Sequence, residues 1–247
     1  MAEKFNVKGE LSFPVYDEKT QKITCTYQTE FNELASTGGK FTSITLKGYL
    51  AGALAKVSKS LVNNNDFDLV SYVVKKMAEA IAEFLERELL VGTSGKMTGA
   101  LSTTNLVTAA SASVITADEL ISTQMKVKKV FQKGCRWTMN MKTFEVVRKL
   151  KDGQGNYLLI KDAREEESWR LLGKPVELSD NMPDIGTGNK PILYGDYSGI
   201  YVKFSEDINV EVLRERFATE HALGVIGWVE ADSNIVEPQK IAALKMA

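Results

Sequence analysis

The side chains that could do chemistry in this chain are few and far apart. Its single histidine, His221, lies in the stretch Thr219-Glu220-His221-Ala222, and its two cysteines are Cys25 and Cys135. A zinc-protease motif needs a second histidine nearby, and a catalytic triad needs a nucleophile that the histidine can activate. The two cysteines show no metal-type spacing. We therefore expect a structural or surface histidine, two free thiols and no metal site.

Two glycine-rich segments and one acidic run are the remaining candidates for phosphate binding or acid–base chemistry. Gly186-Thr187-Gly188-Asn189-Lys190 and Thr37-Gly38-Gly39-Lys40 both lack the eight-residue pattern of a phosphate-binding loop. Glu165-Glu166-Glu167 is typical of a solvated acidic face, although an active site built from carboxylates alone stays open. The sequence therefore predicts no cofactor and no enzymatic activity. A small carboxylate enzyme is kept as one alternative.

The overall composition is that of a nearly neutral globular protein. The 247 residues are 44% hydrophobic, which is enough for a sizeable core in one large domain or two small ones. The 31 basic and 32 acidic residues give a net charge of −1 and no general case for nucleic-acid binding. No apolar run approaches the roughly 18 residues of a membrane span, and the N-terminal stretch shows no signal peptide. We expect a protein made in a cytoplasm that has no membrane partner.

Hydrophobic periodicity predicts a mixed α+β chain. Residues 9–46 alternate as strands do, but they carry too few apolar side chains for a core of their own, so this excursion needs a partner surface. A short helix is expected within residues 48–64. A long amphipathic helix of about 25 residues follows, with Asn65 or Asp66 as its N-cap and Gly92 just past its end.

The second half of the chain is expected to alternate short helices and strands. Thr116 and Glu119 have the spacing of a capping box, for a helix that runs to about Phe131. A further helix is expected over residues 142–149. Strands are expected at residues 136–139, 171–178, 191–194, 200–216, 217–228 and 241–244. Between the second and third of these strands, residues 179–190 form a polar loop that looks built to project from the fold.

Several segments, taken in order, resemble the major capsid proteins of tailed phages, which have the Hong Kong 97-like fold. The resemblance covers nearly the whole chain from Gly9 onward. Its carriers are the excursion 9–46, residues 56–61 with the long helix, Leu90-Val91-Gly92-Thr93-Ser94-Gly95 with Gly99-Ala100-Leu101, residues 139–144 and 149–158, Leu172-Gly173-Lys174-Pro175-Val176, and Gly195-Asp196-Tyr197. The family's proline and tryptophan are missing from residues 139–144. No single motif is highly specific, but the order and spacing of all of them together are specific to the family.

The resemblance implies a division into three parts. Residues 1–46 would be a short N-terminal arm and the E-loop hairpin, residues 47–110 and 200–231 the peripheral (P) domain with its long spine helix, and residues 111–199 and 232–247 the axial (A) domain. The polar loop would lie at the tip of the A domain, near the symmetry axis of a capsomer. The residues implied in assembly are Asp17, Glu18, Lys19, Lys22 and Lys40 in the E-loop, and Asp180, Asn181, Met182, Pro183, Asp184 and Lys190 in the axial-tip loop.

By this resemblance, the chain is expected to be the major capsid protein of a tailed bacteriophage or prophage. It would self-assemble through pentamers and hexamers into an icosahedral shell in the host bacterial cytoplasm, and its final location would be the virion capsid. The shell would enclose double-stranded DNA without sequence specificity. Scaffolding protein, portal and maturation protease are the further partners that the resemblance implies. An encapsulin-like nanocompartment shell, which shares the fold, is the alternative.

The family's covalent cross-link is not expected in this chain. In the reference phage, a lysine and an asparagine of neighbouring subunits form an isopeptide bond with the help of a glutamate. The corresponding positions here fall near Leu34 and Leu223, and only Glu230 matches. We therefore expect shells held together by non-covalent contacts alone.

Overall fold

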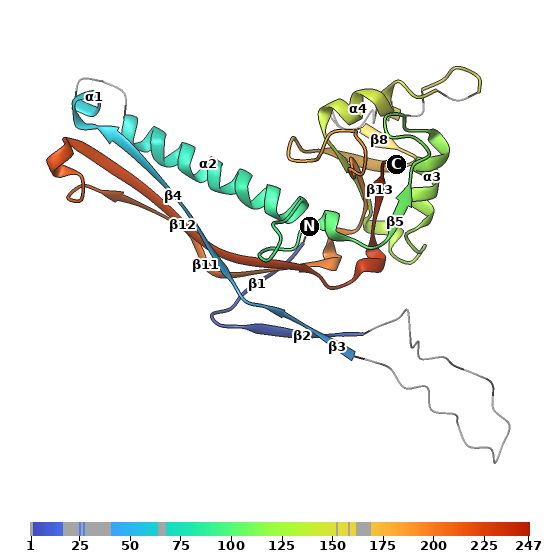
Figure 1. Ribbon diagram of the computed structural model, residues 1–247, viewed down its shortest axis with the longest axis horizontal. Coiled ribbons are helices and arrows are strands. Elements are labelled where there is room, and N and C mark those ends of the chain that lie inside the picture. Colours follow the sequence, from blue (N-terminus) through green and yellow to red (C-terminus); the bar gives the residue numbers. More distant parts are fainter. Residues whose placement is uncertain are drawn as a thin grey trace, which may run out of the picture.

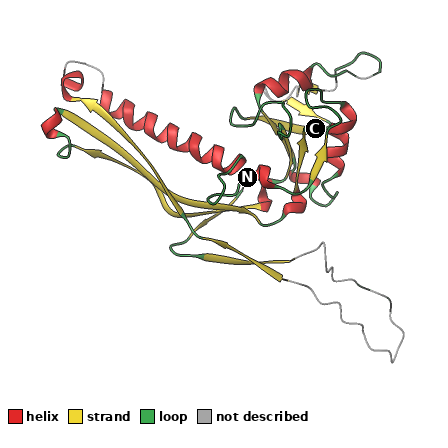
Figure 2. Cartoon of the chain, viewed as in Figure 1, coloured by secondary structure: helices red, strands yellow, loops and turns green. Residues whose placement is uncertain are grey.

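The computed structural model describes residues 2–16, 25, 27, 41–63, 68–151, 153–157, 159–161 and 169–247. It has three parts: an elongated arm, a compact lobe and a two-stranded hairpin that extends away from both (Figure 1, Figure 2). The N-terminus lies where the arm meets the lobe, and the C-terminus lies in the lobe (Figure 1). The mixture of helices and strands confirms the α+β class.

The arm consists of one four-stranded sheet with a long helix along one face. In the order β1-β11-β12-β4, its strands are β1 (Glu3–Asn6), β11 (Ile200–Leu213), β12 (Ala222–Ile235) and β4 (Tyr49–Ser58). Strand β1 runs parallel to β11, and the other pairs are antiparallel. Helix α2 (Leu69–Leu90) packs its buried Met77, Ile81 and Leu85 against Val225 and Val229 of β12. This apolar contact makes the arm a stiff unit.

The short helix expected within residues 48–64, with its end near Asn63, is confirmed, and residues 49–58 before it form a strand. Side chains of β4 alternate between half-buried beneath α2 and exposed on the other face, which is the period of a strand. Each residue of β4 is also paired in register with β12. Only α1 (Lys59–Asn63) is helical. The alanines of β4 favour a helix locally, but pairing with β12 overrides that preference.

Helix α2 begins later than expected, because its N-cap is Asp68 and not Asn65 or Asp66. The Asp68 carboxylate accepts hydrogen bonds from the side chain and the backbone N–H of Ser71, and these bonds lower the pKa of Asp68. The helix has 22 residues and is roughly 33 Å long. Gly92 follows it with φ of +76°, and a Cβ there would lie 2.4 Å from the backbone nitrogen of Gly99. This close crossing of the chain requires glycine.

The lobe is built around a seven-stranded sheet of order β5-β13-β10-β6-β9-β8-β7. Its elements are β5 (Leu106–Thr108), α3 (Ala117–Met125), β6 (Arg136–Met139), α4 (Met141–Arg148), β7 (Leu159–Lys161), β8 (Trp169–Leu171), β9 (Lys174–Leu178), β10 (Ile192–Gly195) and β13 (Ile241–Lys245). Trp137 and Tyr194 pack together in its core, with ring centroids 4.5 Å apart and the ring planes tilted by 45°. A second apolar cluster, which includes Leu193 and Ile200, continues from the lobe into the arm. None of the described helices combines the length and apolar composition needed to span a bilayer.

The capping box at the start of α3 is confirmed. The backbone N–H of Glu119 donates to Thr116 Oγ1, and the Glu119 carboxylate accepts the N–H groups of Thr116 at 2.8 Å and Ala110 at 2.7 Å. Burial acts to raise the pKa of the Glu119 carboxyl, but these hydrogen bonds outweigh it, so the pKa lies below its usual value. Glu119 therefore ties the helix to the preceding loop as well as capping it.

Helix α3 ends at Met125, so its expected extension to about Phe131 was wrong. The backbone N–H of Lys126 bonds to the carbonyls of Ser122 and Thr123, and that of Val127 bonds to Gln124. These tightened turns end the α-helix, and a 3₁₀ turn (Gln132–Gly134) follows before β6. The result is an exposed lysine-rich segment on the surface of the lobe.

Candidate assembly surfaces

The side chains considered for chemistry are not gathered into a site. His221 is exposed in a left-handed turn before β12, with φ of +49°. Cys25 is exposed, and Cys135 is buried in the lobe, where burial raises the pKa of its thiol. Within the part of the chain that the structure describes, no three His, Cys, Asp or Glu side chains lie close enough to hold a metal ion. Glu165-Glu166-Glu167 lies outside the described residues.

The hairpin of β2 (Leu11–Tyr16) and β3 (Phe41–Leu46) is anchored to the arm at its base, where Phe13 packs against Phe5 and Tyr201. Asp232 Oδ2 accepts the N–H of Lys47 at 2.7 Å, and Lys203 Nζ donates to the Lys47 carbonyl at 2.6 Å. Lys203 and Asp232 are buried and face each other across β11 and β12. We call this pair the hairpin clamp, because it holds Lys47, at the point where the hairpin leaves the sheet.

Gly48 completes the base of the hairpin. Its φ is +121°, and a Cβ there would lie 2.4 Å from Glu230 Oε1. Glu230, the match to the family's cross-linking glutamate, therefore packs at the hairpin base. The E-loop residues expected to act in assembly, Asp17, Glu18, Lys19, Lys22 and Lys40, lie outside the described residues.

The face of the four-stranded sheet opposite α2 exposes large apolar side chains. Leu50 is 62% exposed, Leu54 48% and Trp228 39%. The Trp228 ring lies over Gly52, where a Cβ would be 2.3 Å from it. The alternate residues of β4 and β12 point to the other side and pack against α2. We call Leu50, Leu54 and Trp228 the outer sheet face, a surface with the character of a protein contact.

The loop between β9 and β10 packs against the arm, so the expectation that it projects from the fold was wrong. Ser179 Oγ donates to Glu86 Oε1 of α2 at 2.5 Å. Met182 is only 3% exposed and belongs to the apolar cluster that joins lobe and arm. Asn140 Nδ2 donates to the Met182 carbonyl at 3.2 Å and to Asp184 Oδ1 at 2.7 Å. These contacts fix the loop on the side of the lobe that faces α2.

The charged residues of this loop are held by the lobe. Lys142 Nζ lies 2.6 Å from Asp184 Oδ2, and this bond is the main cause that lowers the pKa of Asp184. Lys190 is half-buried and donates to the Leu101 carbonyl at 2.5 Å, and its burial lowers its pKa. Asp180 is exposed, whereas Asn181 and Pro183 are half-buried. The placement of this loop near a symmetry axis stays a prediction.

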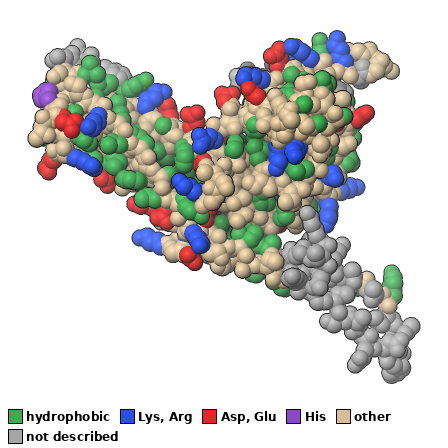
Figure 3. Space-filling view, in the orientation of Figure 1, with side chains coloured by type: hydrophobic (Ala, Val, Ile, Leu, Met, Phe, Trp, Pro, Cys, Tyr) green, Lys and Arg blue, Asp and Glu red, His purple; other side chains and the backbone are tan. Residues whose placement is uncertain are grey.

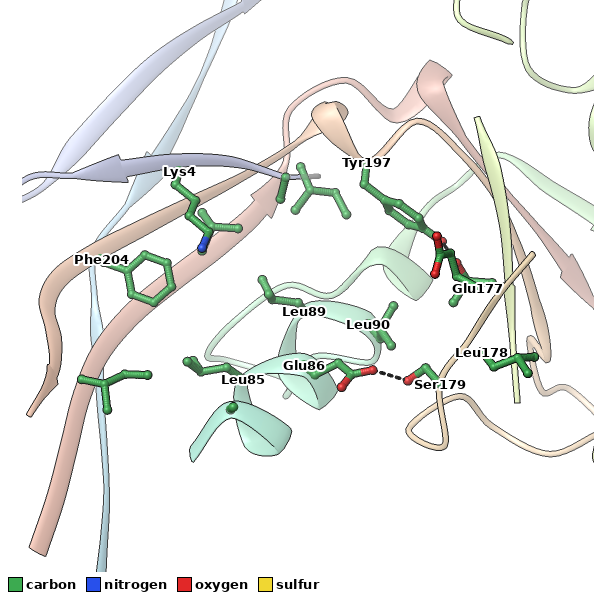
Figure 4. Close-up of a pocket in the computed structure, with 16 residues that line it drawn as sticks. Lys4, Leu85, Glu86, Leu89, Leu90, Glu177, Leu178, Ser179, Tyr197 and Phe204 are labelled. Atoms are coloured by element: carbon green, nitrogen blue, oxygen red, sulfur yellow. Dashed lines mark hydrogen bonds between the residues drawn. The ribbon is translucent and has the colours of Figure 1, made fainter. Parts of the chain in front are cut away.

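An open cavity of about 520 Å³ lies where α2, β1, β11 and β9 meet (Figure 4). Its walls are mostly apolar and include Leu85, Leu89 and Leu178. The hydrogen bond between Glu86 and Ser179 crosses one side of it, and Lys4 lies at another (Figure 4). Because the cavity is open to solvent and its walls are mostly apolar, it has room for an apolar side chain of a partner.

Sequence reasoning missed both the outer sheet face and the cavity. Side chains two or four residues apart on a strand lie on the same side of the sheet. The spacing of Leu50 and Leu54 therefore indicates the outer sheet face once residues 49–58 are known to be a strand, and pairing with β12 adds Trp228. The cavity has no comparable sequence signal, because its walls come from segments that are far apart in the chain.

Comparisons with known proteins agree with this architecture. The model of the family described as "Phage capsid family" matches residues 5–246. The capsid of a native GTA particle is 23% identical with a TM-score of 0.84, and that of an empty GTA particle is 24% identical with a TM-score of 0.82; each match covers 100% of this chain and 88% of the other. A chain from Microbacterium phage Oxtober96 is 16% identical with a TM-score of 0.74, over 100% of this chain and 89% of the other. No curated protein matches the chain.

Proposed function

The chain belongs to the phage capsid family, and from this premise we propose how it builds a shell. It is a major capsid protein with the Hong Kong 97-like fold. The encapsulin alternative is not favoured, because the matching family is that of phage capsids and the similar structures come from phages and GTA particles. Capsid proteins of this family are structural proteins, and we propose that this chain has no enzymatic activity.

In the proposed mechanism, the hairpin of one subunit covers the outer sheet face of a neighbour. One observation carries this proposal: the hairpin extends away from its own chain (Figure 1), while Leu50, Leu54 and Trp228 remain uncovered on the arm. A two-stranded hairpin is marginal alone, so it gains stability on a second surface. Each contact is modest, but closed symmetry repeats it around every capsomer.

We further propose that the arm is the P domain, with α2 as its spine helix, and that the lobe is the A domain. The A domains would meet around the five- and six-fold axes of pentamers and hexamers, and the loop of residues 179–190 would take part there. The Pro183→Asp variant tests this placement, because a buried charge at the axis would impair ring closure without unfolding the monomer. If a folded Pro183→Asp protein formed normal rings, the proposed placement of this loop at the axis would be refuted.

The proposed shell encloses double-stranded DNA without reading its sequence. The sequence contains no base-reading motif, which supports enclosure without sequence readout. The net charge of −1 suits a shell of densely packed subunits, because strong like charge would oppose assembly. A portal, a scaffolding protein and a maturation protease are the partners proposed for assembly in the bacterial cytoplasm. No covalent cross-link is proposed, and boiled shells should run on a denaturing gel as one 27.3 kDa band. A ladder of larger bands would contradict that expectation.

The decisive experiment examines purified protein by negative-stain electron microscopy and light-scattering mass. The wild-type chain should give pentamers, hexamers or closed shells. The Leu54→Asp variant places a charge on the outer sheet face, so it should give fewer shells, whereas Leu54→Met keeps the face apolar and should assemble normally. A wild-type protein that stays monomeric at high concentration would refute the proposed function. Normal shells from Leu54→Asp would refute only the role of this face.

A further inference from the structure

Strand β4 forms an unpaired edge of the four-stranded sheet in the arm. Its register with β12 is continuous from Tyr49 to Ser58, and the Lys59 N–H donates to the His221 carbonyl one step further along the same register. In an antiparallel pair only alternate residues bond to the opposite strand, so the odd-numbered residues of β4 bond to β12. The residues whose N–H and C=O groups point away from β12 are Leu50, Gly52, Leu54 and Lys56.

These outward backbone groups are unpaired in the folded chain. Within the residues that the structure describes, none of the four N–H groups and four C=O groups takes part in a hydrogen bond. Such an edge is a template for another strand, and proteins protect it with bulges, prolines, outward charges or very short strands. Strand β4 is ten residues long, has no proline and pairs with β12 without a register shift, whereas the opposite edge strand, β1, has only four residues.

The one charged side chain of β4 does not guard the edge. Lys56 Nζ lies 2.8 Å from Glu220 Oε2 and 4.5 Å from the centroid of the Phe217 ring. Phe217 in turn lies over Gly224 of β12, where a Cβ would be 2.5 Å from its ring. Lys56 therefore leans back over its own sheet, and the edge stays open to a further strand.

We propose that β4 of one subunit pairs antiparallel with β4 of a second copy, so that two four-stranded sheets become one across a two-fold axis. In the register that pairs all the outward groups, Leu50 lies opposite Lys56 of the partner subunit, and Gly52 lies opposite Leu54 of the partner subunit. This inference rests on the proposed function. The contact is isologous and joins only two copies, so it links neighbouring rings and does not close one.

The side chains on both faces of β4 suit this register. The Trp228 ring covers Gly52, where a Cβ would be 2.3 Å from it, so Leu54 of the partner subunit packs beside that ring, and the contact occurs twice. Figure 3 shows hydrophobic side chains exposed along the arm between α1 and the hairpin. No two like charges are opposed, because Lys56 is the only charge on the strand.

The two copies of α2 also have room on the other face. The side chains of β4 beneath α2 are those of Ala51, Ala53 and Ala55, which are small. Helix α2 packs on Val225 and Val229 of β12, and in the joined sheet the two copies of β12 lie three strand spacings apart, about 14 Å. Packed helices need only about 8–10 Å between their axes.

A second β4 suits the edge better than the hairpin of a neighbour does. The same strand satisfies every outward group of its copy, whereas Pro14 leaves β2 without one N–H. A hairpin that lies across the outer sheet face is also above the sheet, and it cannot at the same time lie in the plane of the sheet at its edge. Pairing of the edge with a hairpin is therefore the competing outcome of the test.

Paired cysteines test the register. In a Cys25→Ser background, Leu50→Cys with Lys56→Cys places two thiols on opposite α-carbons about 5.5 Å apart, a span that suits a disulfide. Within one strand the two positions are about 20 Å apart, so they cannot join in the same chain. Oxidation of assembled protein with diamide should give dimers of the 27.3 kDa chain on a non-reducing gel. Leu50→Cys alone and Lys56→Cys alone are the matched controls and should stay monomeric on the gel.

Proline tests the backbone hydrogen bonds. Leu54→Pro removes an N–H that points away from β12, so the chain keeps its own ladder, and Leu54→Ala is the matched control that loses the same leucine but keeps the N–H. Leu54→Pro should form rings but at least about tenfold fewer closed shells than Leu54→Ala, because the proline ring blocks the partner strand. Ala53→Pro removes an N–H that bonds to β12, so it should unfold at a lower urea concentration than Leu54→Pro.

Several results would overturn the inference. Shells of the paired-cysteine variant that give no dimers would do so, and so would shells of wild-type amount from a folded Leu54→Pro protein. If Leu54→Pro lost its shells while the paired cysteines stayed unlinked, the hairpin of a neighbour would be the strand on this edge. If Leu54→Pro did not fold, the paired cysteines would decide alone.

The same experiments separate this inference from the proposed function. Wild-type rings and shells would keep the proposed function intact whatever happens at the edge. Cross-linked dimers from a protein that never forms rings would keep the edge contact and refute the proposed function.

Discussion

Removal of the Asp232 carboxylate should destabilise the protein more than any surface change. Asp232 is 5% exposed and accepts the N–H of Lys47 and the N–H of Ser233, each at 2.7 Å. A hydrogen bond to a charged group contributes about 1.5–3 kcal/mol, and a buried N–H left without a partner carries a further penalty. We expect Asp232→Ala to lower the free energy of unfolding by about 3 kcal/mol, which corresponds to a fall in Tm of about 6–12 °C for a chain of this size.

The assay is urea unfolding followed by tryptophan fluorescence, with Asp232→Asn as the matched control. Asparagine keeps an oxygen acceptor but loses the charge, so its free energy of unfolding should fall between those of the wild type and the alanine variant. The slope of the free energy against urea should stay unchanged, since the folded surface is the same. An Asp232→Ala variant within about 0.5 kcal/mol of the wild type would refute the clamp as an energetic anchor.

The other half of the hairpin clamp gives a second, ordered comparison. Lys203 is fully buried and donates to the Lys47 carbonyl at 2.6 Å. Lys203→Met removes this bond but also removes the cost of a buried charge, so we expect a loss of only about 1 kcal/mol. Asp232→Ala should therefore lower the free energy of unfolding more than Lys203→Met does. A larger loss for Lys203→Met in the same urea assay would show that the hydrogen bonds of the Asp232 carboxylate are not the main contribution of the hairpin clamp.

Three further changes test separate parts of the fold. Gly48→Ala should cost about 1–2 kcal/mol, because its φ of +121° is strained for alanine and Glu230 occupies the space of the new Cβ; an unchanged urea midpoint would contradict this geometry. Glu119→Ala should cost about 1 kcal/mol at neutral pH. The folded pKa of the Glu119 carboxyl is lowered, so its contribution is full above the unfolded pKa of about 4.3 and is lost as the pH falls through the folded value. The gap between wild type and variant should therefore close in acid, and a gap that persisted there would contradict the assigned hydrogen bonds. A thiol reagent should modify the exposed Cys25 quickly and the buried Cys135 only on unfolding, so Cys25→Ser should abolish the fast phase; a fast phase that survived would show that Cys135 is accessible.

Local sequence patterns were sufficient to predict the elements that are stabilised by interactions between residues close together in the chain. The apolar spacing of α2 predicts a long amphipathic helix whatever surface it packs against. Thr116 and Glu119, which are three residues apart, cap α3 through hydrogen bonds to each other. The order of several weak motifs also sufficed for the family, because each motif marks a turn or a strand end that the fold needs in that place. The exact ends of helices were less well determined, as Asp68 and Met125 show, since competing caps and turns lie within a few residues of each other.

The sequence by itself determined the α+β class, the long helix, the capping box, most strands and the resemblance to phage capsids, because these depend on neighbours along the chain. Only the tertiary structure decided that residues 49–58 are a strand, because β12 supplies their partners from a distant segment. It alone placed the loop of residues 179–190 against Glu86 and closed the hairpin clamp around Lys47. It also left the outer sheet face uncovered. Such surfaces arise from residues far apart in the sequence, and a local pattern carries no information about which of them meet.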